Sequence, residues 1–141
     1  TLCKEYGQKI ARLGNTYGPR MDENDSRVIP TFIRLAKEDE DLNVIDQFDS
    51  FTYVDDIVDG LYRFMKSKRM GVIEFGSDTV ISISNLALLI IKELDSKSKL
   101  NIIPGKSGRK TVSDITKAKE LLKWQPKVNI EKGIRLMIRS N

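Results

Sequence analysis

The sequence predicts an α/β fold built on parallel strands. Short runs of β-branched and aromatic residues alternate with longer segments of helical periodicity along most of the 141 residues. Turn residues separate the two kinds of segment, and no repeat or low-complexity tract interrupts them. With 40% hydrophobic and 31% charged residues, the composition is that of a folded globular domain.

The N-terminal part is predicted to hold a helix end, a strand and a complete helix. Residues 1–9 fit the last turns of a helix that closes near Gly7. Residues 10–13 form a short apolar run that fits a buried strand, and a loop containing glycine and proline, 14–19, follows it. In α/β proteins ligands bind beyond the carboxyl ends of such strands. Residues 27–37 carry apolar side chains at helical spacing, with a proline in the first turn.

The middle of the chain contains two further strand candidates and a helix. Residues 42–45 and 51–54 are the strands, and the second leads into Asp55 and Asp56. These carboxylates suit a helix N-terminus as caps and as charges facing the helix dipole. An acid/base pair is the less favoured interpretation of the same two residues. The helix, 56–66, is expected to bury one apolar stripe, formed by Ile57, Val58, Leu61, Phe64 and Met65.

A strand and a helix follow in the next segment. Residues 72–75 fit a strand that stops at Gly76, and Ser82 is expected to cap a helix that ends near Leu94. The longest apolar run, 86–91, lies in this helix and is far shorter than the roughly 20 residues that span a bilayer. We therefore expect no membrane association and a cytoplasmic protein.

The C-terminal elements are one strand and two helices. Residues 100–103 fit a strand that a Pro-Gly pair closes. Asp114 is expected to cap a helix over 115–123, and Asn129 a last helix that ends near Arg139. Trp124, between them, is interpreted as a packing anchor.

The residue inventory excludes several kinds of site. Cys3 is the single cysteine, so no internal disulfide can form, and we expect its side chain to be a small buried apolar group. The chain has no histidine, which argues against a zinc site and removes the usual general base. The net charge is +4, but 24 basic residues are interspersed with 20 acidic ones. We therefore expect no nucleic-acid partner.

The nucleotide-binding motifs that begin many parallel sheets are missing from the sequence. It contains neither a G-x-G-x-x-G turn nor a G-x-x-x-x-G-K loop. Taken alone, the residues indicate a piece of an α/β protein with a ligand loop after the strand at 10–13.

Four segments, in order, resemble the extended short-chain dehydrogenase/reductase family. The most similar members are the UDP-glucuronate decarboxylases, with the dTDP-glucose dehydratases and UDP-sugar epimerases as further relatives. Residues 1–6 also resemble the end of the helix that carries the Tyr-x-x-x-Lys pair of this family. The four segments are Asn-Thr-Tyr-Gly-Pro-Arg-Met at 15–21, Arg-Val-Ile-Pro-Thr-Phe-Ile at 27–33, residues 50–61 and residues 114–126.

The resemblance extends over nearly all of this chain but over only the second half of the usual family length. It implies the C-terminal portion of a Rossmann-type parallel sheet, interleaved with the small substrate-binding α/β domain. The Gly-rich turn and the Tyr-x-x-x-Lys pair would precede Thr1, so no catalytic residue is expected in 1–141. The intact parent would be a homodimer that binds NAD and a UDP- or dTDP-sugar. It would oxidise the sugar transiently at C4 and then epimerise, dehydrate or decarboxylate it.

The family's binding residues can be transferred only to matching positions. The resemblance implies substrate contacts by Asn15, by the helix start around Val28, Ile29 and Phe32, and by the base-reading strand from Asn43 to Ile45. It implies cofactor contacts by Thr16 and Arg27. Each position has a simpler alternative: a turn residue for Asn15, a solvated charge for Arg27, and core packing for Val28, Ile29 and Phe32.

Several positions depart from the family pattern. Asp49 stands where an arginine holds the diphosphate, Ile45 replaces an aromatic residue, and Gly14 replaces a bulkier residue beside the cofactor. Arg109 and Lys110 are candidates for a second phosphate-binding arginine, although their spacing to Asp114 is irregular.

These departures leave open two other interpretations. One is a non-catalytic, diverged or truncated relative that binds a partner, and the other is an unrelated α/β domain. If half of the sheet is missing, its exposed edge should make the isolated chain self-associate or rearrange.

Overall fold

The computed structural model describes residues 7–106, 108 and 110–140. Residues 1–6 of the helix end predicted over 1–9, with Cys3 and its predicted burial, and the phosphate-binding candidate Arg109 lie outside the described residues. The last residue of that predicted helix end, Lys9, belongs to a strand. The described chain divides into two compact units, each built from three separate stretches of sequence. Unit 1 comprises its residues up to 16 with 50–80 and 111–130, and unit 2 comprises 17–49, 81–110 and 131 onward.

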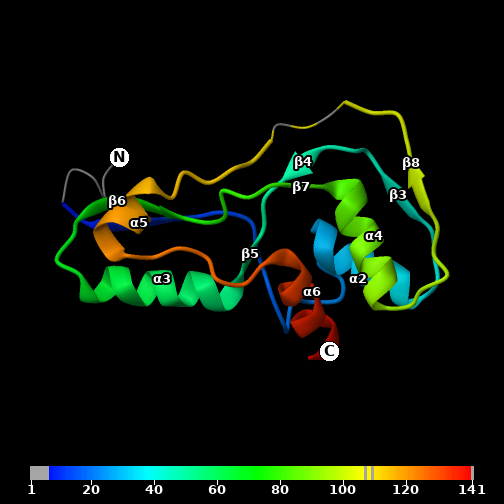
Figure 1. Cartoon of the computed structure of the whole chain (residues 1–141), viewed down its shortest axis with the longest axis horizontal. Coiled ribbons are helices and arrows are strands. Elements are labelled where there is room, and N and C mark those ends of the chain that lie inside the picture. Colours follow the sequence, from blue (N-terminus) through cyan, green and yellow to red (C-terminus); the bar gives the residue numbers. More distant parts are fainter. Residues whose placement is uncertain (1–6, 107, 109, 141) are drawn as a thin grey trace. The chain divides into compact units, whose positions relative to one another are not determined.

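Unit 1 is built on two parallel strands, β1 (Lys9–Leu13) and β6 (Gly71–Phe75), which pair in register from Lys9↔Gly71 to Leu13↔Phe75. The short strand β5 (Thr52–Tyr53) leads directly into helix α3 (Val54–Lys66), and α5 (Thr116–Leu122) contacts both α3 and β6. Figure 1 shows β1, β6 and α5 together on one side of α3. The core between them consists of Ile57, Phe64, Ile73, Phe75, Ile115, Ala118, Leu122 and Trp124.

The C-terminal part of unit 1 packs through Trp124, as predicted. Its side chain is fully buried, and its ring meets that of Phe75 edge-on at a centroid distance of 5.2 Å. Its indole N–H donates to the backbone carbonyl of Asp56 at 2.9 Å. The predicted cap of α5 needs a correction, because the N-cap is Ile115, which has no side-chain cap, and Asp114 stands one residue earlier. Its Oδ1 still accepts from both the backbone N–H and the hydroxyl of Thr116, the first residue of the helix.

Two other predictions about unit 1 were wrong. The strand at 10–13 forms but is not buried, because none of the described residues covers the side chains of its last three residues, and Leu13 is 48% exposed. Helix α3 begins two residues earlier than expected and turns only part of the predicted stripe inward. Ile57 and Phe64 are buried, whereas Val58 and Met65 are exposed, because they lie further around a helix that rotates about 100° per residue.

The described residues of unit 2 form three helices and short strand pairs. Helix α2 (Val28–Lys37) packs on α4 (Ile83–Glu93), and both contact β3 (Leu42–Val44). Strand β3 pairs in parallel with β8 (Leu100–Ile102), and β4 (Phe48–Asp49) pairs antiparallel with β7 (Ile81–Ser82). The remaining elements are β2 (Thr16–Tyr17), at the boundary of the units, and α6 (Ile130–Arg139).

The helices of unit 2 match their sequence predictions closely. Ser82 caps α4 as expected, its hydroxyl accepting from the backbone N–H of Asn85 at 3.2 Å. The apolar run 86–91 buries Leu86, Ala87 and Ile90. Within the described part of the chain, no helix is both long enough and apolar enough for a membrane crossing.

Candidate functional site

The candidate residues of unit 1 lie where β1 ends. Gly14 continues the strand by donating its N–H to the carbonyl of Phe75 at 2.8 Å. Asn15 connects this end to the segment before α3: its carbonyl accepts from Thr52 N–H at 2.8 Å, and its side-chain amide donates to the carbonyl of Ser50 at 3.1 Å. The hydroxyl of Thr16 donates back to the Gly14 carbonyl at 3.0 Å. Asn15 thus has a structural role, which differs from the turn residue of its simpler interpretation because its partners lie 35 and more positions away.

The small residues at this strand end make room for Ser113. A Cβ on Gly14 would stand 2.6 Å from the Ser113 hydroxyl oxygen, and a Cβ on Gly76 would overlap the same side chain. Ser113 is buried, and its backbone N–H donates to the Ser77 carbonyl at 3.2 Å. The space that a bulkier residue at position 14 would need is therefore occupied by Ser113. No local pattern predicts this contact, because Gly14 and Ser113 lie about a hundred positions apart in the chain.

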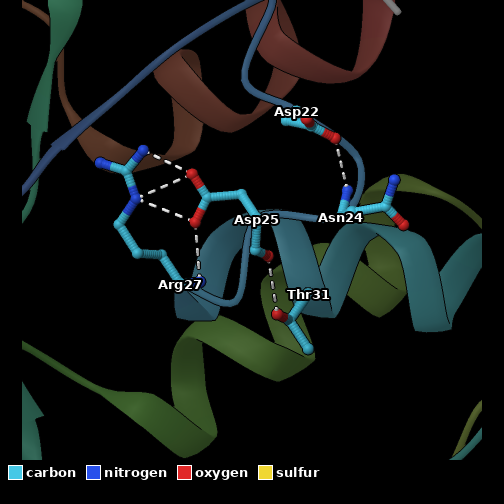
Figure 2. A network of polar contacts seen from close by, with 5 residues as sticks. All are labelled: Asp22, Asn24, Asp25, Arg27 and Thr31. Atoms are coloured by element: carbon cyan, nitrogen blue, oxygen red, sulfur yellow. Dashed lines mark hydrogen bonds and ion pairs between the residues drawn. The ribbon is translucent and has the colours of Figure 1, made fainter.

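In unit 2, Arg27 is held by a neighbouring carboxylate at the start of α2. Figure 2 shows the guanidinium of Arg27 lying against Asp25, with hydrogen bonds of 3.0 Å from Nε to both carboxylate oxygens and a third, of 2.5 Å, from Nη2. The same carboxylate accepts from the backbone N–H of Arg27 at 2.9 Å. The Asp25 carbonyl accepts from the Thr31 hydroxyl, and Asp22 accepts from Asn24 N–H, so the loop is fixed to the helix.

The ion pair changes the electrostatics expected of Arg27. The hydrogen bonds from the Arg27 side chain and backbone lower the pKa of Asp25 to about 2, and the carboxylate raises the pKa of Arg27 in turn. The pair is therefore neutral at physiological pH, although the Arg27 side chain is 63% exposed. The hydrogen bonds to Asp25 come from Nε and Nη2 of the guanidinium, so Asp25 does not use the two N–H donors of Nη1.

The apolar candidates on α2 are mainly core residues. Ile29 and Phe32 are buried, and Val28 is half-buried. The alternative interpretation of Ile29 and Phe32 as packing residues is thus confirmed for their side chains, so any ligand contact at these two positions would involve the backbone.

Strand β3 holds one of the two candidates, Asn43, and ends at Val44, so Ile45 lies just beyond the strand that was predicted to include it. The residues on either side of Asn43 bond to β8: Leu42 N–H donates to the Lys99 carbonyl at 2.9 Å, and the Val44 carbonyl accepts from Ile103 N–H at 2.9 Å. Because backbone groups alternate between the two edges of a strand, the N–H and C=O groups of Asn43 point away from β8. This edge of β3 therefore presents the backbone donor and acceptor of Asn43.

The side chains of these two residues have neighbours that the sequence did not reveal. The amide of Asn101, the register partner of Asn43 on β8, donates to Asn43 Oδ1 at 3.2 Å. Ile45 is 39% exposed, and Gly105 approaches it so closely that a Cβ there would lie 2.6 Å from Ile45 Cδ1. Both contacts depend on strand pairing, for which the local sequence carries no signal.

The loop after β3 is tied to α4 and to the segment that follows β8. Asp46 Oδ1 accepts from Ser84 N–H at 3.1 Å, and the Gln47 carbonyl accepts from Ile83 N–H at 2.8 Å, so both satisfy donors of the first turn of α4. The side-chain oxygen of Gln47 accepts from Gly108 N–H at 2.6 Å. Asp49 follows in β4, half-buried and opposite Ile81.

Asp56 plays a different role from the helix cap expected of it. Helix α3 starts after Tyr53 without a side-chain cap, and Asp56 lies in its first turn, buried. Its carboxylate accepts from the backbone N–H groups of Lys127 and Val128 at 3.0 and 2.9 Å. Asp56 therefore joins α3 to the segment before α6. No group of three or more Asp, Glu, Cys or His side chains in the described residues could hold a metal ion.

Comparison with known proteins relates nearly the whole chain to one family. Residues 4–137 match the family model described as GDP-mannose 4,6 dehydratase. UDP-glucuronic acid decarboxylase 4 of Arabidopsis thaliana is 38% identical over 136 residues, which cover 93% of this chain and 31% of the relative. UDP-glucuronic acid decarboxylase 1 of Xenopus tropicalis is 34% identical over 149 residues, which cover 98% of this chain and 35% of the relative. The chain thus spans about a third of the length of these two relatives.

Solved structures share the fold. The UDP-glucose 4-epimerase of Thermotoga maritima, determined with UDP-glucose, superposes with a TM-score of 0.86 at 29% identity, covering 98% of this chain and 47% of the epimerase. The UDP-glucuronic acid 4-epimerase of Bacillus cereus, determined with UDP-glucuronic acid and NAD, gives 0.85 at 26% identity, covering 99% and 48%. The described fold is therefore that of part of a UDP-sugar epimerase.

Proposed function

Because the chain belongs to the family of NAD-dependent nucleotide-sugar epimerases and dehydratases, we propose that it forms the part of such an enzyme that binds the nucleotide sugar. The observation that carries the proposal is the 38% identity to a UDP-glucuronic acid decarboxylase over 93% of the chain. In this proposal the chain is the C-terminal half of the usual family length, and the Gly-rich turn and the Tyr-x-x-x-Lys pair belong to a preceding half. The isolated chain is then catalytically inert.

The free edge of β3 is the proposed reader of the nucleotide base. Asn43 directs its backbone N–H and C=O groups to the edge that β8 does not use, and Ile45 follows just after the strand. A pyrimidine base such as uracil has an imide edge of alternating acceptors and a donor, which such a strand edge can bind without any charged side chain. Asn15, Val28, Ile29 and Phe32 are proposed to contact the rest of the substrate, with Ile29 and Phe32 acting through their backbones.

Thr16 and Arg27 are the proposed cofactor contacts. The Thr16 hydroxyl, whose proton is bonded to the Gly14 carbonyl, can accept from a hydroxyl of NAD, and the Arg27 guanidinium supplies donors that suit its oxygen atoms. Asp25 neutralises Arg27, so this pair fits a hydroxyl or an amide of the cofactor better than its pyrophosphate. In the intact enzyme the bound cofactor would supply the oxidation at C4 of the sugar, and the residues of this chain would bind and orient.

A second function, a binding protein without catalysis, is favoured by one observation. Asp49 occupies the position at which the family's arginine binds the diphosphate, and a carboxylate there repels phosphate. In this alternative the chain has kept the fold and lost the affinity for the nucleotide sugar.

Calorimetric titration with UDP, UDP-glucuronic acid and NAD tests the proposal. We expect the wild-type chain to bind UDP and its sugar weakly. Asp49→Arg should tighten UDP binding by about tenfold or more, since it replaces repulsion by a charge-assisted hydrogen bond. Asp49→Asn is the matched control, because it removes the charge alone and should give a smaller gain.

Two results would contradict parts of this proposal. If neither the wild type nor Asp49→Arg binds UDP at millimolar concentration, the chain does not bind nucleotide sugars. Turnover of a nucleotide sugar by the isolated chain would show that the chemistry does not depend on a preceding half.

A further inference from the structure

The side chain of Ser113 lies where the two parallel strands of unit 1 end. Gly14 follows β1 directly, and Gly76 follows β6. A Cβ on Gly14 would stand 2.6 Å from Oγ of Ser113, and a Cβ on Gly76 would overlap the same side chain. Ser113 therefore fills the space that two absent side chains leave at the strand ends.

The hydroxyl of Ser113 has no hydrogen-bond partner among the described residues. The residue is 4% exposed, and only its backbone N–H is bonded, to the Ser77 carbonyl at 3.2 Å. Buried polar groups are normally hydrogen-bonded, because a buried hydroxyl without a partner costs free energy. A small apolar side chain would fill the same space without this cost. The hydroxyl therefore indicates a partner that the described residues do not supply.

The position of this hydroxyl is one at which α/β proteins bind ligands, beyond the carboxyl ends of parallel strands. Thr16, a proposed cofactor contact, lies two residues after Gly14 and donates to its carbonyl at 3.0 Å. Asn15, between them, is bonded to the segment before α3, so this stretch of backbone is held in place. Ser113 thus lies against the same fixed segment, 14–16, that carries the proposed cofactor contact.

We propose that the hydroxyl of Ser113 is a further binding group for NAD. The inference rests on the proposed function, in which segment 14–16 contacts the cofactor. A hydroxyl can both donate and accept a hydrogen bond, so it suits the neutral polar groups of NAD, which are the ribose hydroxyls and the nicotinamide carboxamide. Ser113 binds and orients the cofactor in this proposal and takes no part in the chemistry.

An NMR titration of the 141-residue chain with NAD tests the contact. We expect NAD at millimolar concentration to shift the backbone amide signals of Gly14, Gly76 and Ser113. Ser113→Ala should weaken NAD binding by about three- to tenfold, which is the effect of one neutral hydrogen bond. Ser98→Ala is the matched control and should leave NAD binding unchanged. Ser98 is 8% exposed in unit 2, and its hydroxyl accepts from that of Ser96 at 2.9 Å.

Thermal melting without NAD gives a second readout that does not depend on a ligand. Ser113→Ala should leave the melting temperature unchanged or raise it, because the hydroxyl has no bond to a described residue that could be lost. Ser98→Ala removes a bonded hydroxyl and should lower the melting temperature. A clear fall for Ser113→Ala would overturn the proposal, because the hydroxyl would then already be satisfied, by a bound water for example, before NAD binds.

A parallel titration with UDP separates this inference from the proposed function. Ser113→Ala should leave UDP binding unchanged, since the inference assigns Ser113 to the cofactor. If the chain binds UDP but not NAD, or if Ser113→Ala binds NAD as tightly as the wild type does, the role of Ser113 is refuted and the proposed function stands. If neither UDP nor NAD binds, the proposed function fails and the inference fails with it.

Discussion

Replacing Asp56 by alanine removes a buried carboxylate that connects two segments of unit 1. The carboxylate accepts from the backbone N–H groups of Lys127 and Val128, while the backbone carbonyl of Asp56 accepts from Trp124. The substitution leaves the Trp124 bond possible and deprives the two N–H groups of their acceptor. It therefore isolates the contribution of the side chain.

The expected loss follows from these two hydrogen bonds. A hydrogen bond to a charged group contributes about 1.5–3 kcal/mol. Lys127 is exposed and Val128 is half-buried, so water can replace the carboxylate in part. We therefore expect Asp56→Ala to lower the free energy of unfolding by about 3 kcal/mol. Asp55→Ala is the control. Its exposed carboxylate interacts with the helix dipole, and its loss should cost about 0.3–1 kcal/mol.

Urea unfolding followed by fluorescence measures both values. Trp124 is the one tryptophan of the chain, is fully buried and lies beside Asp56, so its emission reports on unit 1. The slope of the unfolding free energy against urea should be the same for both variants. If the two substitutions differ by less than about 1 kcal/mol, Asp56 does not hold the two segments together, and its burial needs another explanation.

Three further outcomes are expected. Gly76→Ala should lower the free energy of unfolding of unit 1 by about 1–3 kcal/mol, because the new Cβ overlaps Ser113. Adding Ser113→Gly should restore most of that loss in the double variant. A loss that Ser113→Gly cannot rescue would contradict the contact. Thr52→Val should leave the free energy of unfolding unchanged or raise it by up to about 1 kcal/mol, since the buried Thr52 hydroxyl has no hydrogen-bond partner among the described residues. A clear fall in the melting temperature of this variant would show that the hydroxyl does have a partner. The pKa of the Asp25 carboxyl, followed by carbon NMR, should be about 2 and should rise toward 3.8 in Arg27→Ala. The stabilisation that the ion pair contributes is therefore complete above about pH 4 and is lost as the pH falls toward 2. An unchanged titration midpoint in Arg27→Ala would contradict the ion pair.

Elements with strong local signals could be predicted from the sequence. Helices α2 and α4 combine apolar periodicity with a proline in the first turn or a serine cap, and both form within one or two residues of the predicted ends. Strands β3, β6 and β8 were found from their apolar runs. The two-residue strands β2, β4 and β7 were missed, because a segment of two residues has no period to detect.

The contacts of the candidate site residues could be predicted only in part from the sequence. The family resemblance indicated which residues to consider. The sequence could not show that Asp25 forms an ion pair with the guanidinium of Arg27, although the two residues are close in the chain. It could not show that Ser113 occupies the space beside Gly14, since that contact depends on tertiary packing. The burial of Ile29 and Phe32 could be anticipated, because their helical spacing already indicated core packing.

Taken together, the charges of unit 2 bear on how a nucleotide sugar would be recognised. Arg27 is neutralised by Asp25, and Asp49 adds a negative charge at a position where a cation was expected. The proposed nucleotide contacts of β3, in contrast, are uncharged backbone groups whose placement is fixed by the β3–β8 hydrogen bonds. In the proposed function, base recognition by the β3 edge would therefore contribute more to specificity than attraction of the diphosphate. Binding of UDP should accordingly weaken little with added salt, whereas recognition through exposed cations would weaken strongly.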